Sequence, residues 1–130
     1  GIAAFVAGGK LLFQSANPDQ GEYYRIMQEN RRAIELATDA RGRRFEIIDL
    51  PAPIVTEHLS DDRNCDCYAN YILVNGGLIA SAFGTPQDAL ARKVFEKAFP
   101  GRRIEMLSTV HIGMGGGSIH CSTQQQPATP

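Results

Sequence analysis

The sequence has 130 residues, which is enough for one domain with a hydrophobic core and too few for two ordinary domains. Hydrophobic residues make up 43% and charged residues 21%, a balance typical of a soluble globular protein and not of a disordered one. The net charge of -1 gives no basic excess for nucleic acid or an anionic membrane, and no apolar run approaches the ~20 residues of a membrane helix. We therefore expect neither a nucleic-acid partner nor a membrane partner.

The first predicted elements form a hairpin, a helix and a strand. In residues 4–12, two apolar stretches flank a Gly-Gly turn, which predicts the hairpin. Asn17-Pro18 is a typical helix start, and apolar residues recur at helical spacing over residues 23–37. Residues 42–48 then predict a strand. The order of these elements is ββαβ.

The same order returns later in the chain. Residues 72–80 repeat the hairpin of residues 4–12 at an offset of 68 positions, and Thr85-Pro86 repeats the helix start at that offset. Pro100-Gly101 ends the second helix, and residues 101–107 predict its strand. A glycine run follows, after which residues 118–123, rich in β-branched and small side chains, predict one more strand.

These patterns predict an α/β chain of two ββαβ modules plus one strand. We place the modules at residues 1–53 and 67–108, an exposed connector at 54–66, and a Gly-rich turn and strand at 109–130. Repeat architectures usually need three or more units to complete a core. Because the strand at residues 118–123 has no module of its own, we expect the carboxyl-terminal portion of a larger repeat protein. The start at Gly1 without a Met also suggests a processed product or a fragment.

The three cysteines predict a reducing compartment. Cys65, Cys67 and Cys121 are an odd number and do not form a disulfide framework, so we expect a cytoplasmic protein. Cys65 and Cys67 could hold a metal together with His58, but their spacing is not the Cys-x2-Cys of common zinc sites. We expect no metal, and keep a small metal or redox protein as an alternative.

Cys121 follows a glycine-rich turn and is the candidate nucleophile. Glycines let a backbone approach a ligand, which makes Gly116 and Gly117 candidate substrate-binding residues. A thiolate at Cys121 would be a strong nucleophile if a neighbour lowered its pKa. By spacing alone, a buried structural cysteine is the alternative.

The three histidines are weaker candidates. In a strand over residues 118–123, His120 would point to the face opposite Cys121, which argues against His120 as its proton-transfer partner. His111 is expected at the surface or in packing contacts, and His58 in the solvated connector.

One stretch makes the chain recognisable. Residues 115–127, Gly-Gly-Gly-Ser-Ile-His-Cys-Ser-Thr-Gln-Gln-Gln-Pro, are close to a catalytic-cysteine motif, and further matching runs stand in the expected order at residues 68–71, 75–77, 83–84 and 99–102. The chain thus resembles the carboxyl-terminal part of agmatine deiminases and bacterial-type peptidylarginine deiminases. The resemblance implies a pentein fold, in which five ββαβ modules surround a central active site.

The resemblance also implies a reaction. The family's nucleophile matches Cys121, whose thiolate attacks the guanidinium carbon of the substrate, and a histidine protonates the departing ammonia. Two carboxylates hold the guanidinium, and no metal or organic cofactor is needed. The family's catalytic His-x-Asp motif would lie immediately before Gly1, so we expect it to be absent from this chain.

We therefore expect a hydrolase of linear amidines that converts agmatine to N-carbamoylputrescine and ammonia. The expected partners are the guanidine substrate, the upstream part of the same protein and a second copy in a homodimer. A peptidylarginine or arginine deiminase and an amidinotransferase are the enzymatic alternatives, and a pentein binding module is the non-enzymatic one. The 130-residue chain alone is expected to be inactive.

Overall fold

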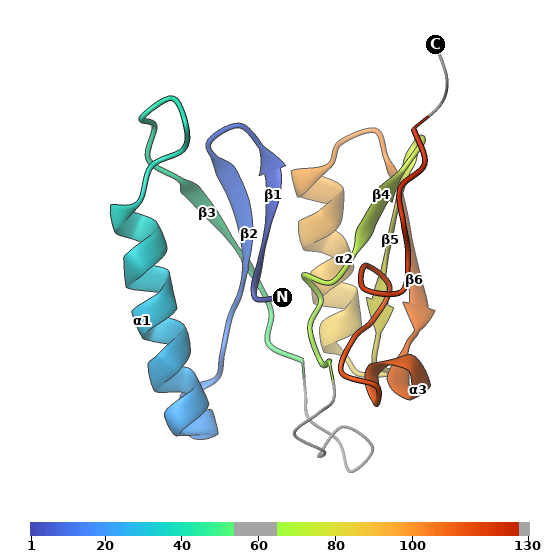
Figure 1. Ribbon diagram of the computed structural model, residues 1–130. Coiled ribbons are helices and arrows are strands. Elements are labelled where there is room, and N and C mark those ends of the chain that lie inside the picture. Colours follow the sequence, from blue (N-terminus) through green and yellow to red (C-terminus); the bar gives the residue numbers. More distant parts are fainter. Residues whose placement is uncertain (54–64, 128–130) are drawn as a thin grey trace.

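The computed structural model describes residues 1–53 and 65–127 (Figure 1). Most of the predicted connector, with His58, lies outside the described residues. The first module consists of strands β1 (Ala3–Ala7) and β2 (Lys10–Gln14), the short 3-10 helix η1 (Pro18–Gln20), helix α1 (Glu22–Leu36) and strand β3 (Glu46–Leu50). The second consists of β4 (Ile72–Val74), β5 (Gly77–Ala82), α2 (Gln87–Ala98) and β6 (Arg103–Ser108), followed by the short helix α3 (Val110–Gly113).

The two modules share one topology, which confirms the predicted pair of ββαβ units. In the first sheet β2 pairs antiparallel with β1 and parallel with β3. In the second sheet β5 pairs antiparallel with β4 and parallel with β6. Each helix provides the crossover between the two parallel strands of its sheet, as parallel pairing requires.

The elements stack in layers, with α2 between the two sheets (Figure 1). Leu11 and Phe13 of β2 pack with Met27 of α1, whereas Leu12 between them joins a core with Phe95 of α2. Successive strand residues point to opposite faces, so both faces of the first sheet are covered. This explains why β2 is apolar without alternation.

The start of α2 departs from the predicted cap. No side-chain cap bond is made at the residue preceding α2. Instead, the carboxylate of Asp88 accepts hydrogen bonds from the backbone N–H groups of Phe83, Gly84 and Thr85 at 2.9–3.3 Å. An acidic side chain in the first turn also interacts favourably with the helix dipole. In the first module, the predicted start at residues 17–18 forms η1, and α1 begins only after Gly21.

The predicted strand at residues 118–123 is wrong. Within the described residues this segment folds into turns, in which the N–H of Ser122 donates to the carbonyl of Ser118 and that of Thr123 to the carbonyl of His120. The Thr123 hydroxyl also donates to the carbonyl of Ile119 at 2.7 Å. Small hydroxyl residues compete for local backbone groups in this way and favour turns over ladders.

The described helices include none that is long and apolar enough to cross a membrane.

Candidate active site

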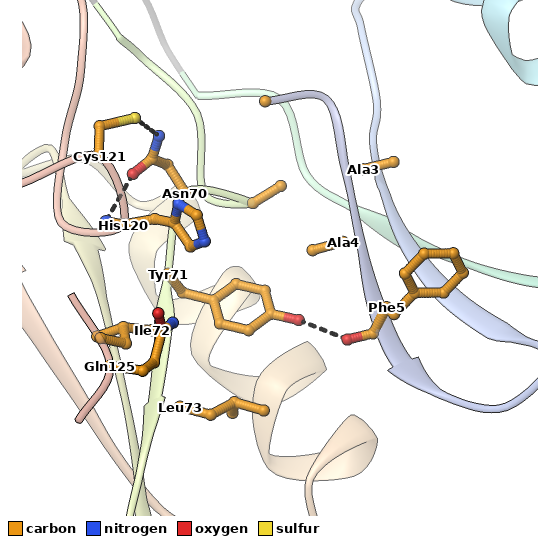
Figure 2. A pocket seen from close by; sticks show the side chains of 12 residues that line it. Ala3, Ala4, Phe5, Asn70, Tyr71, Ile72, Leu73, His120, Cys121 and Gln125 are labelled. Atoms are coloured by element: carbon orange, nitrogen blue, oxygen red, sulfur yellow. Dashed lines mark hydrogen bonds between the residues drawn. The ribbon is translucent and has the colours of Figure 1, made fainter. Parts of the chain in front are cut away.

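A pocket of about 480 Å³ opens between the two modules (Figure 2). One wall comes from β1, with Ala3, Ala4 and Phe5. Another comes from residues 69–73, which lead into β4, and a third from the carboxyl-terminal turn with Cys121. The pocket therefore brings together segments that lie far apart in the sequence.

Cys121 presents its sulfur at this pocket. The residue is exposed, and its Sγ accepts a hydrogen bond from Nδ2 of Asn70 at 3.1 Å. This hydrogen bond, followed by one from the backbone of Ser118, lowers the pKa of Cys121 below the ordinary value for a thiol. Neutral donors therefore favour the thiolate form at this position.

The turn that carries Cys121 is anchored to the second sheet. The hydroxyls of Ser118 and Ser81, both fully buried, lie 2.7 Å apart and are hydrogen bonded. Ser81 belongs to β5, so the bond fixes the start of the turn to the strand beneath it. Gly117 leaves no room for a side chain, because a Cβ there would lie 2.9 Å from the Cβ of Cys121.

The predicted separation of His120 from Cys121 is wrong. The prediction assumed strand alternation, and the segment is a turn, so both residues line the same pocket. The backbone N–H of His120 donates to Oδ1 of Asn70 at 2.8 Å. His120 is thus held at the site through its main chain.

Tyr71 joins the two walls of the pocket. Its hydroxyl donates to the carbonyl of Phe5 at 3.2 Å (Figure 2). Its ring packs edge-on against Phe95 and Phe99. The hydrogen bond links β1 of the first module to the segment before β4. The width of the pocket is therefore set by a contact between modules.

The other two cysteines are in different surroundings. Cys67 is buried, and burial raises its pKa to about 11. Burial also raises the pKa of Cys65. Both thiols are therefore poorer nucleophiles at neutral pH than Cys121.

The family described as Porphyromonas-type peptidyl-arginine deiminase matches residues 1–127 of the chain. The chain belongs to this family. A Streptomyces coelicolor protein provisionally named an agmatine deiminase is 37% identical over 128 residues, which cover 98% of this chain and 38% of the relative. The agmatine deiminase of Ectopseudomonas mendocina is 33% identical over 147 residues, 98% of this chain and 39% of the relative.

A solved agmatine deiminase of Enterococcus faecalis has the same fold over this region. The TM-score is 0.84 at 26% identity, with 97% of this chain and 39% of that structure covered. The predicted fold class, modules of a pentein, is thereby confirmed. The chain spans a little over a third of the length of these deiminases.

The described residues that line the pocket of this deiminase-family chain include no acidic side chain. Among the described residues that line the pocket, Tyr71, His120 and Cys121 carry titratable side chains, and none is Asp or Glu. A planar guanidinium is best held by carboxylates that accept its N–H groups in pairs. The described lining of the pocket therefore includes a sulfur but no carboxylate that could hold a guanidinium.

His111 and Gly116 are not among the described residues that line the pocket. His111 is exposed on α3, and Gly116, with a φ of 82°, shapes the turn. The predicted contacts of Gly116 and Gly117 with substrate stay predictions. No group of three possible metal ligands is found among the described residues, a search that does not include His58.

Sequence reasoning missed the role of Asn70. It stands in a short segment without helical or strand periodicity, and its link to Cys121 spans 51 positions. Asn70 contributed to the family resemblance, but no local signal indicated what its amide contacts. Only the packing of the turn against this segment reveals it.

Proposed function

We propose that the whole protein hydrolyses a guanidine, with agmatine as its substrate, through a covalent intermediate at Cys121. The observation that carries the proposal is the exposed Cys121 sulfur at the pocket, with its pKa lowered by the Asn70 hydrogen bond. The names of the agmatine deiminase relatives support agmatine as the substrate.

The proposed reaction has two stages. The Cys121 thiolate adds to the guanidinium carbon, and the C–N bond to one terminal nitrogen breaks as that nitrogen takes a proton and leaves as ammonia. Water then adds to the same carbon, the C–S bond breaks, and the thiolate is released together with N-carbamoylputrescine. No electrons are gained or lost overall, so the reaction requires no redox partner.

In this proposal, the group that protonates the departing ammonia and the carboxylates that hold the guanidinium come from the rest of the protein. The family resemblance puts a His-x-Asp motif just before Gly1, and Gly1 lines the same pocket as Cys121. A residue preceding Gly1 would therefore start at the same pocket. Consistent with this arrangement, we expect the 130-residue chain alone to release no ammonia from a guanidine.

The test is an assay of ammonia release by the full-length protein with agmatine, arginine and a peptidyl-arginine in parallel. We expect turnover of agmatine that is abolished by Cys121→Ser. Cys65→Ser is the matched control and should retain activity, because Cys65 does not line the pocket. Turnover that survives Cys121→Ser contradicts the proposal.

A peptidyl-arginine deiminase is the second candidate, favoured by the description of the matching family. It uses the same chemistry on a guanidinium at the end of a peptide side chain. Faster turnover of the peptidyl-arginine than of agmatine would select it. Transfer of the amidino group to an added amine would instead indicate an amidinotransferase.

A further inference from the structure

Asn70 is a buried polar residue at the centre of the site, only 4% exposed. Both ends of its amide are used (Figure 2). Its Oδ1 accepts the backbone N–H of His120 at 2.8 Å, and its Nδ2 donates to the Sγ of Cys121 at 3.1 Å. One side chain thus contacts both residues of the His120-Cys121 pair.

These partners fix the orientation of the amide. The backbone N–H of His120 can only donate, so the amide oxygen must face it. The NH₂ group is then left facing the sulfur, and an NH₂ group can only donate. A hydrogen bond to an ionised acceptor is stronger than one to a neutral acceptor, so this geometry favours the thiolate.

We propose that Asn70 is a positioning residue for Cys121: its amide fixes the turn that carries the sulfur and donates a hydrogen bond to the ionised sulfur. The inference deepens the proposed function and rests on it, because it assigns a role at the same nucleophile. Asn70 acts through Cys121 and is not itself proposed to contact the reacting carbon.

The segment that carries Asn70 is held rigidly. The hydroxyl of the fully buried Tyr68 donates to Asp88 at 2.6 Å, and the Tyr68 ring packs edge-on against Phe83 with centroids 5.1 Å apart. Asp88 lies in the first turn of α2 and also holds the loop before it, so the segment with Asn70 is tied to the start of that helix. Because Ser81 anchors the opposing turn, both partners of the amide–sulfur bond are fixed to the second module. Such support holds a site in its working geometry before substrate binds.

Other groups also act on the sulfur and must be held constant. His120 lines the pocket beside Cys121, and the charge of Cys65 also interacts with the Cys121 sulfur. Both groups are the same in wild type and in variants of Asn70. A difference in the pH profile of Cys121 alkylation between wild type and these variants therefore reports the effect of the Asn70 amide.

The test compares Asn70→Asp and Asn70→Ala in the full-length protein. Aspartate has nearly the same shape and keeps an oxygen for the N–H of His120, but it replaces the donor with a carboxylate. The readout is the rate of Cys121 alkylation by iodoacetamide from pH 5 to pH 10, with the labelled residue located by mass spectrometry. Asn75→Asp is the matched control, because it makes the same change on the exposed β4–β5 turn.

We expect the ionisation of Cys121 to move to higher pH in Asn70→Asp, with alkylation at pH 7 about tenfold slower or more. Asn70→Ala should move it in the same direction by less, and Asn75→Asp should leave it unchanged. Turnover should fall at least as far as alkylation does in both Asn70 variants.

A wild-type pH profile in either folded Asn70 variant would overturn the proposal. Loss of folding in both variants, measured by circular dichroism, would also overturn it, because Asn70 would then be a structural residue. Alkylation does not require turnover. A shifted profile in a protein that hydrolyses no guanidine would therefore refute the proposed function and leave the Asn70–Cys121 coupling in place.

Discussion

The sulfur of Cys121 is exposed at the pocket, and hydrogen bonds from neutral groups are the main cause of its lowered pKa. Asn70 and the backbone of Ser118 both act as hydrogen-bond donors to it. Cys67 has the opposite environment, since burial disfavours its thiolate. The three thiols of one chain therefore differ in reactivity because of their surroundings.

This difference predicts selective labelling. At pH 7, a limiting amount of iodoacetamide should modify Cys121 first, Cys65 much more slowly and Cys67 last, because only Cys121 combines exposure with a lowered pKa. Peptide mass spectrometry of the full-length protein measures the order, with Cys121→Ser as the control. Labelling of Cys65 ahead of Cys121 would contradict this account of the site.

A substitution at Gly117 should displace the sulfur of Cys121 while leaving the cysteine itself unchanged. In Gly117→Ala the added Cβ would meet the Cβ of Cys121 at 2.9 Å, so the turn must shift. A misplacement of about 1 Å at a reacting group can cost about a hundredfold in rate, so we expect turnover to fall at least tenfold.

Gly115→Ala is the matched control for this experiment. Its Cβ would meet only the carbonyl oxygen of Ile112, at 3.5 Å, an ordinary contact. Ammonia release by both variants measures the effect. Equal activities of the two variants would show that the close approach at Gly117 is not needed.

Between elements, a Gly-Arg-Arg run that stands at residues 42–44 and again at residues 101–103 has a structural role. In the second module Arg102 donates from its guanidinium to the carbonyls of Val74 and Gly77, which flank the β4–β5 turn. In the first module the matching Arg43 packs against the Gly8-Gly9 turn. In each module, therefore, the arginine after the helix supports the tip of the hairpin.

Adjacent arginines offer a test of this role. Arg102→Ala should lower the free energy of unfolding by about 1–2 kcal/mol, because it removes hydrogen bonds from a charged donor to two backbone carbonyls. Arg103→Ala should cost less than about 1 kcal/mol, because Arg103 forms an exposed ion pair with Glu105. Urea unfolding of both variants measures the costs. A larger loss for Arg103→Ala would contradict the assignment.

The elements of the fold were predictable from the sequence because their signals are local. The apolar runs and turn glycines predicted both hairpins, and helical periodicity predicted α1 and α2. The segment at residues 118–123 was mispredicted because its β-branched and small side chains suit a strand, while its hydroxyl and backbone groups find partners within the turn. Cys121 was predicted as the nucleophile from a sequence motif. The role of Asn70 could not be predicted in this way, because it depends on a contact with a residue 51 positions away.

At the scale of the whole molecule, the two modules are joined by α2 and by Tyr71. The core that includes Phe95 also contains Leu12 and Leu50 of the first module, so α2 is shared between the sheets. The pocket forms where β1 and the segment before β4 approach each other, and a hydrogen bond from Tyr71 to Phe5 spans that approach. The site is thus a product of module packing and not of either module alone.

Buried thiols should also make the folded state sensitive to alkali. Cys67 has a pKa of about 11 in the folded state, against 9.0 for an ordinary thiol, so the folded state binds its proton more tightly. Its contribution to stability is complete below pH 9 and is lost as the pH rises from 9 towards 11. Thermal unfolding across this range should show a smaller loss in Cys67→Ala than in wild type, and an equal loss would contradict the assignment.

The most direct test of the central claim is the mass of the intermediate. Full-length protein mixed with agmatine and quenched in acid should gain the mass of agmatine less ammonia, located on the peptide that contains Cys121. An adduct that carries only the amidino group would indicate a transferase. An adduct on Cys65 or Cys67, or turnover in Cys121→Ser with no adduct in wild type, would contradict the assignment of Cys121 as the nucleophile.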